Sequence, residues 1–218
     1  MPDYIDTIEA PAFPRHEITG VILAGGRGRR MQCVDKGLVM VEGKPLVEHV
    51  INALRPQVST ILISANRNLE RYRAYGHPVI ADSNGDHAGP LAGMASGMAT
   101  ATTPYILAVP CDAPRIPVTL AEGLYRALAA QRTDLSVVHD GTRLQPVFSL
   151  LRCTLLPDLQ VYLAGGGRRV DAWTVQQSVA LADFSIEAAA FMNLNTAADF
   201  NALATVSDRR TGGHVING

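Results

Sequence analysis

The chain has 218 residues, of which 47% are hydrophobic, and a formal net charge of -1 at pH 7. This length fits one domain with short ends, so we predict an N-terminal extension over 1–17, one domain over 18–205 and a flexible tail over 206–218. The near-neutral charge argues against a nucleic-acid or membrane surface, and no apolar run is long enough to span a bilayer. Because the first residues also lack the apolar segment of a secretory signal, a cytoplasmic protein is predicted.

The first clear element is an apolar run over 21–23 that leads into a loop rich in glycine and arginine. We interpret the run as a buried strand, and the loop from Leu23, Ala24, Gly25 and Gly26 as a cradle for phosphates, because glycine lets the backbone approach a ligand closely. Positive charges follow at 27, 29, 30 and 36. The alternative is an ordinary turn with a solvated basic loop, since neither the dinucleotide fingerprint nor a P-loop is present.

Strands and helices are expected to alternate after this loop. A helix over 46–54 and a buried strand over 59–65 complete a strand-helix-strand unit. A short strand over 79–81 precedes a helix of small residues over 89–97 that begins near Pro90 and packs closely on the sheet or on a ligand. A further strand covers 105–109, and Thr119 with Glu122 forms the pattern of a capping box for the next helix.

The second half of the chain is less regular. Strands are predicted over 134–139 and 145–151, and the turn Asp140-Gly141 between them favours a hairpin. A helix over 154–163 ends at a run of three glycines, and a last helix is predicted to begin at Thr196. These elements give an α/β fold: one Rossmann-like domain with an open, mainly parallel sheet, helices on both faces and an antiparallel edge hairpin.

Polar residues follow several of the predicted strands. Ligands of such folds lie at the carboxyl ends of the strands, where Leu23, Asn66, Asp82 and Asp112 are all expected. Asp112 suits Mg²⁺, which is held by one or two carboxylates together with substrate phosphates, although a turn aspartate is an equal alternative. Lys36 would then stabilise charge on a departing pyrophosphate, without a protein nucleophile.

The choice of base is assigned to Asp82 and Asn66. A carboxylate can accept hydrogen bonds from both donors on the edge of guanine, so an aspartate in a base pocket indicates a guanine nucleotide. Asp82 could equally cap the next turn.

Several of these motifs together resemble a known family. The chain is similar to the sugar-nucleotide-transferase-like nucleotidyltransferases and, among them, to the molybdenum cofactor guanylyltransferases. The resemblance covers about Thr19 to Leu203 and rests on these segments: Leu23-Ala24-Gly25-Gly26, Arg30-Met31, Asp35-Lys36-Gly37-Leu38, Asn66-Arg67, Asp82-Ser83, Gly89-Pro90-Leu91-Ala92-Gly93, Pro110-Cys111-Asp112 with Pro114, Arg168-Arg169-Val170 and Asn193-Leu194-Asn195-Thr196.

The resemblance implies Mg²⁺-dependent transfer of GMP from GTP to the terminal phosphate of the molybdopterin cofactor, with release of pyrophosphate. Lys36 and Asp112 would be catalytic, and Asp112 would also bind the metal. GTP would contact Leu23, Ala24, Gly25, Gly26, Lys36, Asn66, Asp82 and Asp112. Molybdopterin would contact Arg30, Gly89, Gly93, Arg168, Arg169, Asn193 and Asn195. Proteins that deliver the cofactor or accept it are further expected partners.

One segment departs from the family pattern, and two other functions stay open. This chain has Met31-Gln32-Cys33 where the family has smaller residues, so the contacts with the pterin are the part most open to change. The alternatives are a cytidylyltransferase acting on the molybdenum cofactor or on a sugar alcohol phosphate, and a non-catalytic module that senses GTP. Asp82 and Asn66 favour guanine over cytosine, and Lys36 with Asp112 favours catalysis over sensing.

Overall fold

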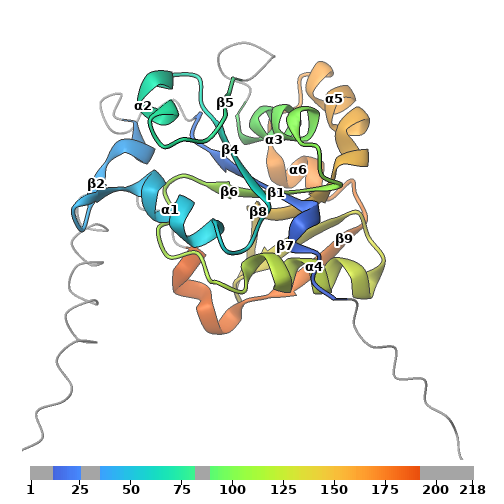
Figure 1. Ribbon diagram of the computed structural model, residues 1–218. Helices are drawn as coiled ribbons and strands as arrows, with labels where there is room; N and C mark the ends of the chain where they lie inside the picture. Colours follow the sequence, from blue (N-terminus) through green and yellow to red (C-terminus); the bar gives the residue numbers. More distant parts are fainter. Residues whose placement is uncertain (1–11, 26–34, 82–88, 192–218) are drawn as a thin grey trace, which may run out of the picture.

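A seven-stranded sheet forms the centre of the molecule (Figure 1). The computed structural model describes residues 12–25, 35–81 and 89–191. The strand order in the sheet is β5-β4-β1-β6-β8-β7-β9. The strands are β1 (Ile18–Leu23), β4 (Thr60–Ser64), β5 (Val79–Ile80), β6 (Tyr105–Pro110), β7 (Leu135–His139), β8 (Leu144–Arg152) and β9 (Val179–Asp183). A separate small hairpin pairs β2 (Met40–Val41) with β3 (Lys44–Pro45).

The sheet has a parallel half and a mixed half. Strand β1 pairs in parallel with β4 on one side and with β6 on the other, and β4 pairs in parallel with β5. Strand β8 is antiparallel to both β6 and β7, whereas β9 at the edge is parallel to β7. The predicted α/β fold with a mainly parallel sheet and an antiparallel hairpin is confirmed.

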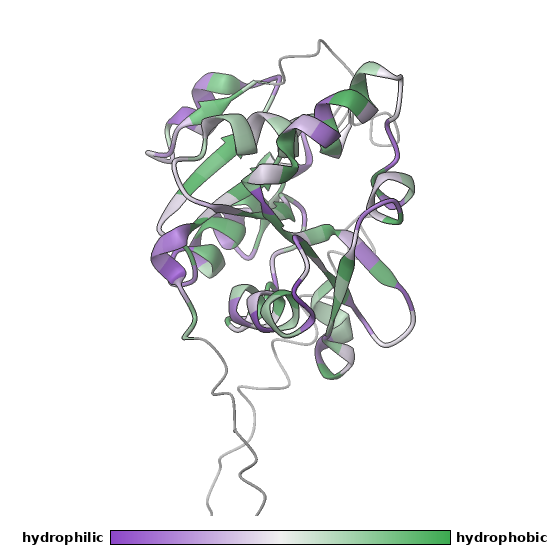
Figure 2. Ribbon diagram, turned by 90° about the vertical axis from the view of Figure 1, so that its right-hand side faces the viewer, coloured by the Kyte–Doolittle hydropathy of each residue, from purple (hydrophilic) through white to green (hydrophobic). Residues whose placement is uncertain are grey.

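Helices cover both faces of this sheet, and each face has its own apolar core (Figures 1 and 2). Val50 and Leu124 belong to the core of one face, whereas Met94, Leu159 and Trp173 belong to the core of the other. The helices are α1 (Leu46–Leu54), α2 (Leu69–Arg73), α3 (Pro90–Thr100), α4 (Leu120–Gln131), α5 (Leu156–Ala164) and α6 (Val170–Thr174). Short 3₁₀ turns are η1 (Arg15–Glu17), η2 (Lys36–Leu38), η3 (Cys153–Leu155) and η4 (Ser185–Phe191).

The start of α4 corrects one sequence prediction. Thr119 makes no side-chain capping bond, because it lies in a turn in which Leu120 N donates to Pro117 O at 3.1 Å. The buried amide of Gln57 takes over this role: its Oε1 accepts a hydrogen bond from Ala121 N at 2.9 Å. The cap therefore comes from a residue that is distant in the sequence, and an expected capping box is replaced by a tertiary contact.

The sequence analysis did not predict α2, α6 or β9. The two helices have five residues each, which is too short for a helical period to show. Residues 12–17, the described part of the segment that was expected to lie outside the fold, contact it. The ring of Phe13 packs edge-on against Tyr125 with a centroid distance of 6.2 Å, and Arg15 Nη2 donates to Arg55 O at 3.0 Å.

The predicted helix at Thr196 and the predicted tail lie outside the described residues. Within the ranges that the structure does describe, no helix is long and apolar enough to cross a membrane.

Candidate active site

The order in which strands are added to the sheet reverses between β1 and β6, although the two strands are parallel. A ligand is expected at such a point. From β1 the chain passes outward to β4 and β5, and it then returns to the opposite side of β1 as β6. In the register of the sheet, Leu23 at the end of β1 lies opposite Ser64 of β4 and Pro110 of β6. Such a switch point opens a crevice at the carboxyl ends of the strands.

The backbone after β1 is held firmly at this edge. Ala24 N donates to Ser64 O at 2.7 Å, and Cys111 N donates to Leu23 O at 3.2 Å. Ala24 is buried, whereas Gly25 is exposed, so the chain leaves the sheet at Gly25. Gly26 and Arg30, the other loop residues assigned to the site from the sequence, lie outside the described residues, as do Gln32 and Cys33.

Lys36 and Asp112 meet at the same edge although they are far apart in the sequence. Lys36 begins η2, Asp112 follows β6, and Lys36 Nζ lies 2.9 Å from Asp112 Oδ2. The side chain of Asp112 is 9% exposed and that of Lys36 is 31% exposed. A buried carboxylate is stable as an anion only beside a compensating charge, so this ion pair forms the charged centre of the switch point.

The neighbouring thiol is that of Cys111, and its surroundings disfavour the thiolate form. Burial raises the pKa of Cys111, and the nearby carboxylates of Asp112 and Asp35 raise it further. The thiol therefore stays protonated at neutral pH and lacks the nucleophilic thiolate form.

A second carboxylate, Asp35, lies directly before Lys36 and is held by α2. Tyr72 donates its hydroxyl to Asp35 Oδ1 at 2.5 Å, and Asn68 Nδ2 donates to Asp35 Oδ2 at 2.9 Å. Sequence reasoning assigned no role to these side chains. The pairing of Asp35 with a buried tyrosine has no local signal, because the two residues meet only through the fold.

Asn66 follows β4, as predicted, and is half-buried beside the same edge. The preceding Ala65 N donates to Ile80 O at 2.9 Å, so the ends of β4 and β5 are joined directly. Asp82, the residue assigned to guanine recognition, lies outside the described residues.

The small residues of α3 are explained by packing on the sheet. A Cβ atom added at Gly93 would lie 2.7 Å from both Leu23 Cδ2 and Ser64 Oγ, and one added at Gly97 would lie 2.7 Å from Val21 Cγ2. The sequence left open whether this helix packs closely on the sheet or on a ligand. In the structure Gly93 packs on the sheet. Gly89, in contrast, is exposed, with φ of +73° and the backbone of Arg168 close by.

The two arginines before α6 have protein partners. Arg168 Nη1 donates to Leu163 O in the last turn of α5 at 2.8 Å and to Gly167 O in the loop after it at 2.6 Å. Arg169 pairs with Asp171 of the same segment, with 3.1 Å between Nε and Oδ1. Gly89 and Arg168 are thus brought together, whereas Asn193 and Asn195 lie outside the described residues.

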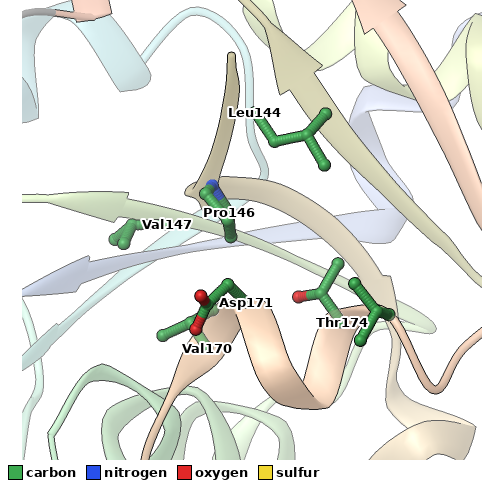
Figure 3. A pocket seen from close by; sticks show the side chains of 7 residues that line it. Leu144, Pro146, Val147, Val170, Asp171 and Thr174 are labelled. Carbon is green, nitrogen blue, oxygen red and sulfur yellow. The ribbon is translucent and has the colours of Figure 1, made fainter.

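An apolar pocket of about 430 Å³ lies between β8 and α6 (Figure 3). It is lined by Leu144, Pro146, Val147, Val170, Asp171, Thr174 and Val175. The β8 side of the pocket is a bulge: Val137 lies opposite Ser149, but the next residue, Val138, lies opposite Gln145. Proline cannot donate to a sheet ladder, and Pro146 occupies this bulge. Because β8 is antiparallel to β6, the residues before Ser149 extend towards the carboxyl end of β6.

A metal site made by protein side chains alone is not found among the described residues, since no group of three or more His, Cys, Asp or Glu side chains is suitably placed. Of the two carboxylates described at this edge, Asp35 is held by Tyr72 and Asn68, whereas Asp112 faces the ammonium of Lys36.

Comparisons with known proteins show the family and the fold of the chain. The sequence profile of the MobA-like NTP transferase domain matches residues 20–179, so the chain belongs to this family of nucleotidyltransferases. Among solved structures, a molybdopterin-guanine dinucleotide biosynthesis protein A from Archaeoglobus fulgidus superposes with a TM-score of 0.73 at 18% identity, covering 88% of this chain and 99% of that one.

Within that class the chain belongs to the molybdenum cofactor guanylyltransferases, as two relatives demonstrate. The protein of that name from Acidovorax ebreus is 45% identical over 207 residues, which is 89% of this chain and 98% of the relative. The one from Ralstonia nicotianae is 46% identical over 201 residues, with 88% and 98% covered. The resemblance drawn from the sequence motifs is confirmed.

Proposed function

We propose that this protein transfers GMP from GTP to the terminal phosphate of molybdenum-bound molybdopterin and releases pyrophosphate. The observation that carries the proposal is the ion pair of Lys36 and Asp112 at the switch point of the sheet. The choice of substrates is supported by the name shared by relatives that match almost over their whole length.

The proposed reaction is a direct displacement. An oxygen of the acceptor phosphate attacks the α-phosphorus of GTP, the bond from that phosphorus to the oxygen bridging to the β-phosphate breaks, and pyrophosphate leaves with the electron pair. The protein contributes mainly positioning and charge neutralisation. Lys36 would bind the triphosphate, and the backbone at Leu23, Ala24 and Gly25, with Gly26 beyond, would line its path.

The residues present fit a role for Mg²⁺. Asp112 is a buried carboxylate that already faces a cation, the ammonium of Lys36, and a hard cation such as Mg²⁺ takes carboxylate and phosphate oxygens together. When bound, Mg²⁺ would neutralise charge on the phosphate oxygens, with Asp112 as its protein ligand. Lys36 would at that point exchange its carboxylate partner for the phosphates.

Asn66 and Asp82 are proposed to recognise the base. The amide of Asn66 offers a donor and an acceptor at the end of β4, and the carboxylate of Asp82 suits the two donors of guanine.

The acceptor is proposed to bind on the side of β8 and α6. Gly89 and Arg168 lie together there, and the apolar pocket adjoins Arg169 through the first residues of α6. An apolar surface next to basic side chains suits a heterocycle that carries a phosphate. Arg30, Asn193 and Asn195 complete the proposed contacts with the pterin. Proteins that deliver the cofactor or take it on are the proposed partners.

One assay tests the proposal against its alternatives. The purified protein is incubated with molybdenum-bound molybdopterin, Mg²⁺ and each nucleoside triphosphate in turn, and pyrophosphate release is measured. We expect release with GTP and little with the others. Release with CTP alone would show a cytidylyltransferase, and GTP binding without any release would show a sensing module.

A further inference from the structure

The segment Asp35 to Gly37 is wedged between α2 and the end of β6. A Cβ atom added at Gly37 would lie 2.5 Å from the Tyr72 hydroxyl and 3.3 Å from Cys111 Sγ. Only a glycine lets the backbone pass through this gap. The position of the whole segment is therefore set by its two neighbours, the ring of Tyr72 and the chain after β6.

Tyr72 provides the polar contact that fixes this segment. Its side chain is fully buried, and its hydroxyl donates to Asp35 Oδ1 at 2.5 Å. The second carboxylate oxygen accepts from Asn68, which precedes α2 with φ of +52°. Asp35 is thus held at both oxygens by the helix, and the next residue along the chain is Lys36.

We propose that Tyr72 is a positioning residue for the reaction: through Asp35 it fixes the backbone from which Lys36 reaches Asp112. The inference rests on the proposed function, in which Lys36 binds the triphosphate. A buried hydroxyl costs free energy unless it is hydrogen-bonded, and a phenylalanine would fill the same apolar space without that cost. Packing alone therefore does not explain why residue 72 carries a hydroxyl. The hydrogen bond that places Asp35 does explain it.

The position of Lys36 can be measured by its chemical reactivity, because the chain contains only two lysines, Lys36 and Lys44. Lys44 lies in β3 and pairs with Glu48 at 3.2 Å, with 53% of its side chain exposed, so it serves as an internal reference. Each protein is treated with a trace of acetic anhydride, and acetylation of the two lysines is compared by peptide mass spectrometry. In the wild type we expect Lys36 to react about tenfold more slowly than in Asp112→Asn, because its nitrogen is held against the Asp112 carboxylate at 2.9 Å and is shielded there from the reagent.

The test variant is Tyr72→Phe, which removes one oxygen and keeps the ring. We expect the acetylation rate of Lys36, measured relative to that of Lys44, to rise about tenfold, as for the loss of a hydrogen bond to a charged group. This rise is the loss of protection of Lys36. We also expect kcat for pyrophosphate release to fall about tenfold, with the KM for the acceptor unchanged. The matched control is Tyr75→Phe in the turn after α2, where no change in either quantity is expected.

A second variant separates positioning from general stability. Asp35→Ala removes the acceptor of the same hydrogen bond, so the double variant with Tyr72→Phe should lose hardly more protection of Lys36 than either single variant. Additive losses, or unchanged acetylation of Lys36 in folded Tyr72→Phe, would overturn the proposal. If the wild type turned over no nucleotide, the proposed function would fail, while acetylation would still decide whether Tyr72 places Lys36.

Discussion

The two halves of the sheet build two different kinds of surface. In the parallel half, strands β1, β4 and β6 all end at one edge, so charged and polar residues from distant parts of the sequence meet there. In the mixed half, β8 carries a bulge and packs against a short helix, and the result is an apolar pocket. Strand direction alone thus separates a centre suited to phosphates and a cation from a surface suited to a larger, partly apolar molecule.

The largest effect is expected from Asp112→Asn in the parallel half. The amide keeps the shape of the side chain but loses the charge that faces Lys36 and would hold Mg²⁺, so kcat should fall by about 10²–10³-fold. Pyrophosphate release measures the loss, and circular dichroism checks that the fold is kept. Turnover at the wild-type rate would remove Asp112 from the site.

The packing of α3 on β1 gives the next largest effect. In Gly93→Ala the new methyl group would meet Leu23 and Ser64 at 2.7 Å, so we expect a loss of about 1–3 kcal/mol in the free energy of unfolding. The control is Gly165→Ala, where the added atom meets Val161 O at 3.5 Å, an ordinary contact. Urea unfolding measures both variants. Equal stability of the two would show that α3 can move away from the sheet.

The turn of the hairpin in the mixed half provides a pH-dependent effect. Hydrogen bonds from Gln145 and Thr142 and from the backbone N–H of Arg143 hold the pKa of Asp140 well below its usual range. A carboxylate with a lowered pKa in the folded state stabilises the protein above its unfolded pKa of about 4, and this stabilisation is lost as the pH falls further.

Asp140→Asn should therefore be less stable than the wild type at pH 7, by about 1–2 kcal/mol. The difference should shrink as the pH falls below about 4. Unfolding curves at pH 7 and at successively lower pH values measure it. A difference that stayed constant with pH would show that the charge of Asp140 plays no part.

The smallest effect, and the one that best separates the two halves, is expected from Val175→Trp. Val175 is 73% exposed and lines the pocket, so a larger ring can fill the pocket with little effect on stability. We expect the KM for the acceptor to rise about tenfold, as for the loss of a buried contact, while the KM for GTP stays unchanged. A rise in the KM for GTP alone would place the pocket on the nucleotide side.

The sequence predicted the parallel half of the fold better than the contacts that complete it. The strand before Gly25 and the positions of Asn66 and Asp112 just after their strands follow from apolar periodicity and from the rules of parallel sheets. The capping of α4 by Gln57 and the contact of Tyr72 with Asp35 could not be predicted, because each joins residues that only the fold brings together. Pro146 within the strand predicted over 145–151 is typical of a bulge, a signal that the sequence analysis did not use. The pocket also needs α6, a helix too short to recognise from the sequence.

The most direct test of the central claim is the position of a bound cation. Crystals of the protein with GTP and Mn²⁺, which like Mg²⁺ prefers oxygen ligands, would be examined for anomalous scattering. We predict a Mn²⁺ peak in contact with the Asp112 carboxylate, with Lys36 moved onto the phosphates of GTP. A nucleotide and metal bound elsewhere, with Lys36 still paired to Asp112, would contradict it.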